Sequence, residues 1–169
     1  MENYEKETIA AIATALSDSG IGIVRISGEN AIYIVDSIFR SASGKKILTK
    51  VQSHMIHYGY IVDKDENIID EVMTSVMKAP KSYTMEDTVE INCHGGVLVM
   101  QKVLETVLQA GARLAEPGEF TKRAFLNGRI DLSRAEAVID VIHSQNEYAL
   151  SSSVSQLKGR LSDKIRSLR

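Results

Sequence analysis

The hydrophobic pattern of this chain changes at about residue 118, and this change constrains the fold more than any other feature. Before it, short runs rich in β-branched residues alternate with turn-forming residues, a pattern typical of strands. Strands are expected in segments 8–14, 21–28, 54–63, 68–79, 87–93 and 112–120, with residues 64–67 as a hairpin turn. Segments 29–40 and 96–111 instead repeat apolar residues at helical spacing, and Gly111 is placed to end the second. Residues 1–118 therefore predict a β-rich α+β domain whose sheet is covered by two helices.

The pattern after residue 118 is helical. Segment 119–128 predicts a short helix that Gly128 ends, and Asp131 is placed to cap the next helix. From Leu132 to Arg169 there is no proline and only one glycine. This predicts a single continuous helix, roughly 60 Å long at about 1.5 Å per residue.

The apolar residues late in this predicted helix are spaced three or four apart, as in a coiled-coil seam. They are Val154, Leu157, Leu161, Ile165 and Leu168. A seam of this kind needs a partner. We therefore expect either that the chain is a fragment of a longer protein, or that the helix packs against a second copy.

Charge and cysteine content narrow the class of protein. The formal net charge is −2, so no global basic field attracts nucleic acid, and only a local patch would bind RNA. The single cysteine cannot form an internal disulfide, which suits a reducing compartment. No apolar run approaches the roughly 20 residues of a membrane span, and the N-terminus lacks the apolar region of a signal peptide. We expect a cytoplasmic protein that does not associate with a membrane.

Segment 90–96, EINCHGG, gathers side chains capable of chemistry. Cys93 and His94 are neighbours in an expected strand, where successive side chains point to opposite faces. A nucleophile and its base must share a face or come from separate elements, which argues against a Cys–His catalytic pair. A metal site would need more ligands, and the chain has no CxxC or HxxxH motif. A small buried thiol before a turn is the preferred interpretation.

Three further features, two in this segment and one at Arg25, allow two interpretations each. Gly95 and Gly96 suit a strand-to-helix turn, whose amides would bind an anion, although tight packing explains them equally well. Glu90 is either a solvated carboxylate or an acceptor for two adjacent donors, such as the N–H and NH2 of a guanine or pterin edge. Arg25 is either a surface cation or a clamp for an anionic ligand. The residues alone do not decide between these interpretations.

Three linked motifs resemble one known family. Three segments are similar to the N-terminal part of the tRNA modification GTPases of the MnmE (TrmE) family. They are TIAAIATALSDSGIGIVRISG, SYTMEDTVEINCHGG and EPGEFTKRAFLNGRIDLSRAEAVIDVI. The likeness runs from residue 8 to about residue 145, in the order and spacing of the family. It implies an N-terminal tetrahydrofolate-binding domain that resembles aminomethyltransferases and forms a homodimer. A helical domain and a Ras-like GTPase domain inserted in its helices would follow.

The resemblance also implies a reaction and a set of ligands. With an FAD-containing partner, MnmG (GidA), the family modifies the wobble uridine of certain tRNAs at C5. An aminomethyl or carboxymethylaminomethyl group results, and its one-carbon unit comes from 5,10-methylene-tetrahydrofolate. GTP hydrolysis with Mg²⁺ and K⁺ drives a rearrangement of the GTPase domain.

Folate contacts are carried over from the family to three matching positions. They are Arg25 of the VRISG motif, Glu90 before CHGG, and Arg129 of the LNGRIDL motif. The resemblance implies that they hold a tetrahydrofolate derivative, either 5-formyl- or 5,10-methylene-tetrahydrofolate. We assign no catalytic residue and no metal ligand in this chain.

Two departures from the family pattern limit what this chain is expected to do. It has no GxxxxGK[ST] motif, since SGKK at 43–46 lacks the upstream glycine and the following Ser or Thr. It also lacks the family's C-terminal motif with a reactive cysteine, and Cys93 is not that residue. We expect residues 1–118 to bind folate and dimerise, residues 119–169 to begin the helical domain, and the GTPase domain to be absent. By itself the chain should not hydrolyse GTP.

Two alternatives stay open at this point. One is a free-standing folate-dependent one-carbon transferase, which would need a general base near its pocket. The other is a module that only dimerises and binds no ligand.

Overall fold

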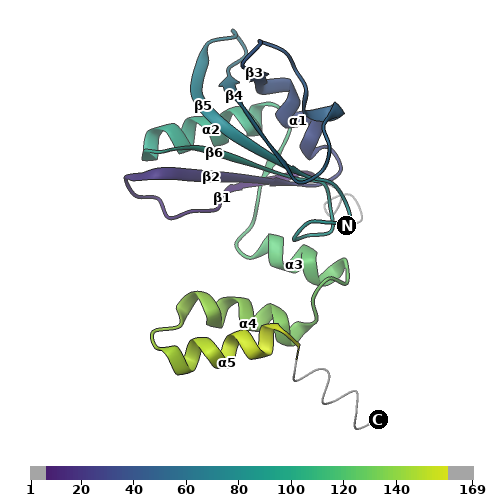
Figure 1. Cartoon of the computed structure of the whole chain (residues 1–169), viewed down its shortest axis with the longest axis vertical. Helices are drawn as coiled ribbons and strands as arrows, with labels where there is room; N and C mark the ends of the chain where they lie inside the picture. Colours follow the sequence, from purple (N-terminus) through teal and green to yellow (C-terminus); the bar gives the residue numbers. More distant parts are fainter. Residues whose placement is uncertain (1–6, 160–169) are drawn as a thin grey trace. The chain divides into compact units, whose positions relative to one another are not determined.

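The computed structural model describes residues 7–159 (Figure 1). The chain divides into two compact units between Pro117 and Gly118. The first unit is built on one seven-stranded sheet, and the second consists of helices α3, α4 and α5. The predicted mixed α+β fold is therefore confirmed.

The sheet of the first unit has the strand order β3-β4-β5-β6-β2-β1-β7. Its strands are β1 (Ile9–Ile12), β2 (Ser19–Ser27), β3 (Phe39–Ser41), β4 (Met55–Val62), β5 (Ile68–Met77), β6 (Thr88–Gly95) and β7 (Arg113–Leu114). Neighbouring strands are antiparallel, except that β1 and β7 run parallel. Each predicted strand has a counterpart, but the one predicted over residues 112–120 is limited to the two residues of β7, and α3 already begins at Glu119. The sequence does not predict β3, because its pattern extends the preceding helix to residue 40.

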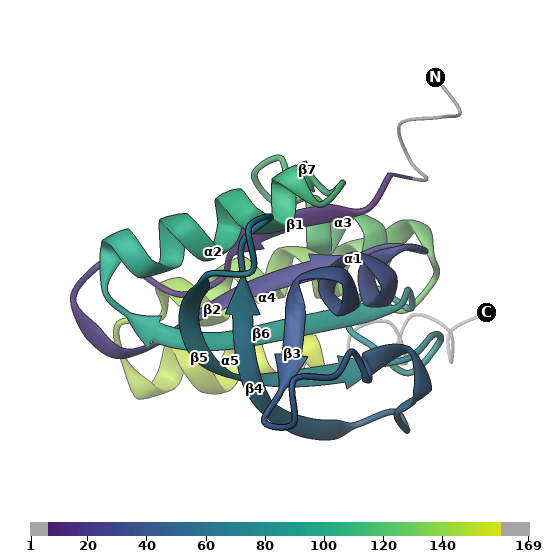
Figure 2. The same cartoon turned by 90° about the horizontal axis from the view of Figure 1, so that it is seen from above.

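Helices α1 (Ala31–Ile38) and α2 (Val97–Gln109) pack against each other and against one face of this sheet (Figure 2). A single-turn 3-10 helix, Leu48–Lys50, packs against α1. The apolar residues of α2 recur at helical spacing, so they lie on one side of the helix. Three of them, Met100, Val103 and Val107, have no exposed area. Gly111 follows the end of α2 with a φ of +118°, as its predicted place after that helix requires.

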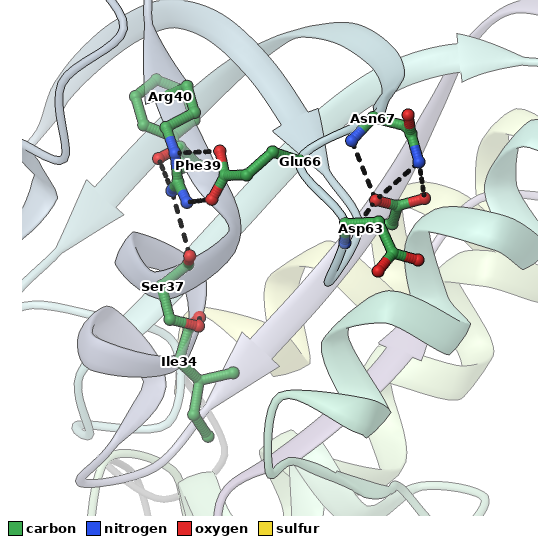
Figure 3. Close-up of polar contacts among 8 residues, drawn as sticks. Ile34, Ser37, Phe39, Arg40, Asp63, Glu66 and Asn67 are labelled. Carbon is green, nitrogen blue, oxygen red and sulfur yellow. Dashed lines mark hydrogen bonds and ion pairs between the residues drawn. The ribbon is translucent and has the colours of Figure 1, made fainter.

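The β4–β5 hairpin closes at the predicted turn, which its own polar groups hold (Figure 3). The Asp63 carboxylate accepts hydrogen bonds from the backbone N–H and the side-chain amide of Asn67, at 2.9 and 3.1 Å. These bonds hold the pKa of the Asp63 carboxyl below its ordinary value. Arg40 of β3 forms an ion pair with Glu66 in the turn and donates to the Ser37 carbonyl at 3.0 Å. Arg40 thereby links the turn to β3 and to the end of α1.

The second unit contains α3 (Glu119–Leu126), α4 (Leu132–His143) and α5 (Glu147–Leu157), with α4 and α5 packed against each other. Gly128 has a φ of +78° in the turn after α3, where the sequence predicts the end of that helix. The Asp131 side chain accepts from the Arg134 N–H at 2.9 Å, which confirms it as the N-cap of α4.

The prediction of one continuous helix from Leu132 is wrong. α4 ends at His143, Ser144 has extended backbone angles, and Asn146 caps a new helix by accepting from the Ala149 N–H at 2.9 Å. Asparagine competes with the helix for hydrogen bonds, so it favours a cap over an interior position. The signal was present as Ser144-Gln145-Asn146 but contains no glycine or proline. Of the predicted seam, Val154 and Leu157 lie on α5, and Leu161, Ile165 and Leu168 lie outside the described residues.

Candidate functional site

The face of the sheet turned away from α1 and α2 carries the two strand residues predicted to bind a ligand. Along β6, side chains alternate between the two faces. Val89, Ile91 and Cys93 are buried in the core, whereas Glu90, Asn92 and His94 lie on the other side. We call this side of the sheet the open face. It also includes the side chains of β2, β4 and β5 that point the same way as Glu90, Asn92 and His94.

Arg25 and Glu90 form an ion pair on the open face. They stand directly opposite each other in the β2–β6 ladder, and Arg25 Nε donates to Glu90 Oε1 at 2.7 Å. The two side chains are 30% and 22% exposed, so water screens the pair only partly while a ligand can still reach it. On the other side of Glu90, Ser75 of β5 is its ladder neighbour. The sheet thus joins two residues that stand 65 positions apart in the sequence.

Tyr83 lies beside this pair, in the segment between β5 and β6. Its ring centroid is 6.0 Å from Arg25 Cζ, within the range of a cation–π interaction. The neighbouring Thr84 lies 2.6 Å from Ser27 Oγ, which donates to Glu86 Oε2 at 2.7 Å. Sequence reasoning does not single out Tyr83. Its only signal is an aromatic residue within a loop of hydroxyl side chains before the strand that carries Glu90.

Cys93 and His94 point to opposite faces, as the strand periodicity predicts. Cys93 is 3% exposed, and burial raises the pKa of its thiol to about 11. The thiol is therefore protonated and a poor nucleophile at neutral pH, which confirms its interpretation as a buried structural residue. His94 Nδ1 lies 2.7 Å from Asp70 Oδ1, and this hydrogen bond raises the pKa of the exposed imidazole.

The two glycines of the segment have different surroundings. Gly95 pairs with Ser19 of β2, and a Cβ added to Gly95 would overlap the backbone of Ser19. Gly96 is the N-cap of α2 with a φ of −68°, and a Cβ added there would first meet Val99 at 3.8 Å. The close approach of two strands therefore accounts for Gly95, and any residue can adopt the backbone angles of Gly96. The predicted strand-to-helix turn is confirmed, since β6 ends at Gly95 and Gly96 caps α2.

The third predicted folate residue, Arg129, belongs to the second unit. It follows the Gly128 turn, and its backbone N–H donates to the Ala124 carbonyl at 2.9 Å. The grouping of Arg129 with Arg25 and Glu90 in one site stays a prediction.

Exposed apolar side chains lie next to the ion pair on the open face. Tyr58 and Met73 are ladder neighbours on β4 and β5 and are 48% and 47% exposed. Ile56, which is 66% exposed, is the ladder neighbour of Ser75 and so lies two strands from Glu90, on the far side of Ser75. A contiguous group of this kind indicates an interaction surface. The sequence does not identify it, because apolar residues at alternating positions also suit a buried face.

Two kinds of site have no support within residues 7–159. None of the helices there is long and apolar enough to cross a membrane. Over the same residues, no three His, Cys, Asp or Glu side chains gather in a way that would hold a metal ion.

Comparison with known proteins adds an independent finding. A family model described as "GTP-binding protein TrmE N-terminus" matches residues 8–129. The chain is 64% identical over 163 residues to the "tRNA modification GTPase MnmE" of Lachnoclostridium phytofermentans. It is 58% identical over 166 residues to the protein of that name from Geobacillus kaustophilus and 54% identical over 164 residues to the one from Bacillus subtilis.

These matches cover nearly all of the chain but a minor part of the relatives. The match to the Lachnoclostridium protein covers 96% of this chain and 35% of that relative. The match to the Geobacillus protein covers 98% of this chain and 36% of the relative, and the match to the Bacillus protein covers 96% and 36%. The chain therefore spans about a third of the length of the curated relatives it matches.

Proposed function

Because the chain belongs to the TrmE/MnmE family and matches its N-terminal part, we propose that it is the folate-binding and dimerising portion of a tRNA modification GTPase. The single observation that supports this most directly is the partly buried Arg25–Glu90 pair on the open face. The ligand proposed is a tetrahydrofolate derivative, 5-formyl- or 5,10-methylene-tetrahydrofolate.

In the complete protein, this portion would serve a reaction at C5 of the wobble uridine of tRNA. We propose an FAD-containing partner, MnmG (GidA), and an aminomethyl or carboxymethylaminomethyl product, made in the cytoplasm where tRNA is found. GTP, Mg²⁺ and K⁺ would bind to the GTPase domain. This chain has no GxxxxGK[ST] motif, so we propose that it does not hydrolyse GTP by itself.

The groups of the proposed site suit the polar edge of a pterin ring. The Glu90 carboxylate only accepts hydrogen bonds, and its two oxygens have enough lone pairs to accept from adjacent N–H and NH2 donors as well as from Arg25 Nε. The guanidinium of Arg25 is always charged and can bind a folate oxygen or carboxylate. Partial burial strengthens both interactions relative to water. Bound folate would supply the one-carbon unit, while these side chains bind and orient it.

The second unit contributes to this proposal through one residue. We propose residues 1–118 as the folate-binding and dimerising domain and residues 119–169 as the first helices of the helical domain. Arg129, in the LNGRIDL motif, would then be the third folate contact, with its cation directed to an oxygen or carboxylate of the ligand.

The apolar part of the open face is the surface proposed for the homodimer. Ile56, Tyr58 and Met73 are each about half exposed or more, and β4 and β5 place them side by side. Burying such side chains against a second copy would stabilise the dimer through the hydrophobic effect.

Calorimetric titration of the chain with 5-formyl-tetrahydrofolate tests the proposal. We expect saturable binding by the unmodified chain and a loss of at least about tenfold in affinity for Glu90→Gln, since a hydrogen bond to a charged group is removed. The matched control is Glu71→Gln, a carboxylate on the neighbouring strand β5 that accepts a hydrogen bond from the Tyr58 hydroxyl. The control should leave the affinity unchanged.

Two outcomes would overturn parts of the proposal. Equal affinity of the chain and Glu90→Gln would show that Glu90 does not read the ligand. If the folded and dimeric chain binds no folate, either it only dimerises or residues beyond it complete the pocket, and adding back the C-terminal segment of the complete protein decides. A free-standing one-carbon transferase would be favoured if no P-loop is encoded downstream of Arg169.

A further inference from the structure

We propose that Tyr83 is a positioning residue that fixes the plane of the Arg25 guanidinium in the folate site. The inference rests on the proposed function for its ligand. It adds a residue that neither the sequence motifs nor the similarity to known proteins assigns to the site.

Two contacts of the Arg25 guanidinium come from different parts of the fold, β6 and the segment before it. Glu90 Oε1 holds its edge through Nε at 2.7 Å. Arg25 Cζ also lies over the Tyr83 ring, 6.0 Å from the ring centroid. The aromatic ring adds a restraint on the motion of the guanidinium beside the hydrogen bond at Nε.

Tyr83 can restrict Arg25 because the protein holds the loop of Tyr83 in place. The residue that follows, Thr84, has no exposed area and is hydrogen-bonded to the equally buried Ser27 of β2 at 2.6 Å. Ser82, on the other side, donates to the Glu86 carbonyl at 2.6 Å. The backbone on both sides of Tyr83 is therefore fixed to the sheet that carries Arg25 or to the loop itself.

The orientation of the guanidinium matters for a planar ligand. Its N–H donors form a rigid fork that binds a carboxylate or a ring oxygen well only when the fork and the acceptor are aligned. A guanidinium that is already oriented loses less entropy on binding, which raises affinity without a new contact. A lysine at position 25 has no plane to orient, and this difference provides a test.

The first test needs no ligand. Nitrogen-15 relaxation of the Arg25 Nε–H group in the unmodified chain should report a more restricted group than in Tyr83→Leu. Tyr83→Phe, which keeps the ring, should retain the restriction. Equal mobility of Arg25 in all three proteins would overturn the inference, whether or not the chain binds folate.

The second test is a double-mutant cycle on the affinity for 5-formyl-tetrahydrofolate. Tyr83→Leu should weaken binding about fivefold, and Tyr83→Phe should change it less than about twofold. In the Arg25→Lys background, Tyr83→Leu should have no further effect.

Each deviation in this cycle has a separate meaning. A fivefold loss that persists with Arg25→Lys would show that Tyr83 contacts the ligand itself, and the positioning role would be wrong. A loss in Tyr83→Phe equal to that in Tyr83→Leu would assign the effect to the hydroxyl, with the same conclusion. If the chain binds no folate even with the C-terminal segment of the complete protein added back, the proposed function fails, and the relaxation measurement alone decides the role of Tyr83.

Discussion

The two faces of β6 belong to one strand, yet they respond to different constraints. Val89, Ile91 and Cys93 are enclosed by the sheet and its two helices, so their size and polarity determine stability. Glu90, Asn92 and His94 alternate with them on the open face, where they contact polar partners on β2 and β5. The comparison teaches that, in this chain, one segment of eight residues serves both the core and the candidate site. Substitutions on the two faces should therefore have clearly different effects on the free energy of unfolding.

The largest contrast is expected between adjacent residues of β6. Ile91→Ala should lower the free energy of unfolding by about 3 kcal/mol, because it leaves a cavity in the core where Ile91 has no exposed area. Asn92→Ala, on the open face, removes one hydrogen bond to the Met73 carbonyl and should cost about 1 kcal/mol or less. Denaturant unfolding of both variants measures the difference. Similar losses for the two would contradict the division of the strand into a core face and an open face.

The glycine pair at the end of β6 provides a second contrast. Gly95→Ala should destabilise the chain by about 2 kcal/mol, because its Cβ would force the Ser19 backbone away. Gly96→Ala is the control and should change stability by about 0.5 kcal/mol or less, since its φ of −68° suits alanine. Thermal or denaturant unfolding compares them. A larger effect at Gly96 would mean that this turn has a requirement other than space.

The smallest effect concerns His94 and depends on pH. The pKa of His94 is raised by its hydrogen bond to Asp70, so its charged form favours the folded state. This contribution is fully present below the unfolded pKa of about 6.5 and is lost as the pH rises through the higher folded value. Asp70→Asn should therefore destabilise the chain more at mildly acidic pH than at alkaline pH.

The direct measurement is an NMR titration of the His94 ring in the unmodified chain and in Asp70→Asn. The pKa of His94 should fall toward its ordinary value in the variant. His94→Gln serves as the control for stability, because Asp70 should then make no pH-dependent contribution through this pair. An unchanged titration of His94 in Asp70→Asn would remove Asp70 as the cause.

Local signals in the sequence are sufficient for much of this fold. Period-two runs predict the strands, helical spacing predicts α2, and Asp131 is recognisable as an N-cap because its side chain acts within three residues. The burial of Cys93 also follows from local pattern, since its neighbours at alternating positions are apolar. The boundary between α4 and α5 was missed for a local reason: Asn146 caps a helix without the glycine or proline that usually marks a break.

The sequence by itself thus determined most of the strands and helices, with β3 and the boundary between α4 and α5 as the exceptions, and the family to which the chain belongs. Tertiary structure decided that Arg25 and Glu90 pair, that Tyr83 lies beside them, and that apolar residues of β4 and β5 share their face. The physical reason is that periodicity assigns a side chain to one of two faces but does not choose its neighbour. The register of β2 against β6 makes that choice, and packing of the whole core fixes the register.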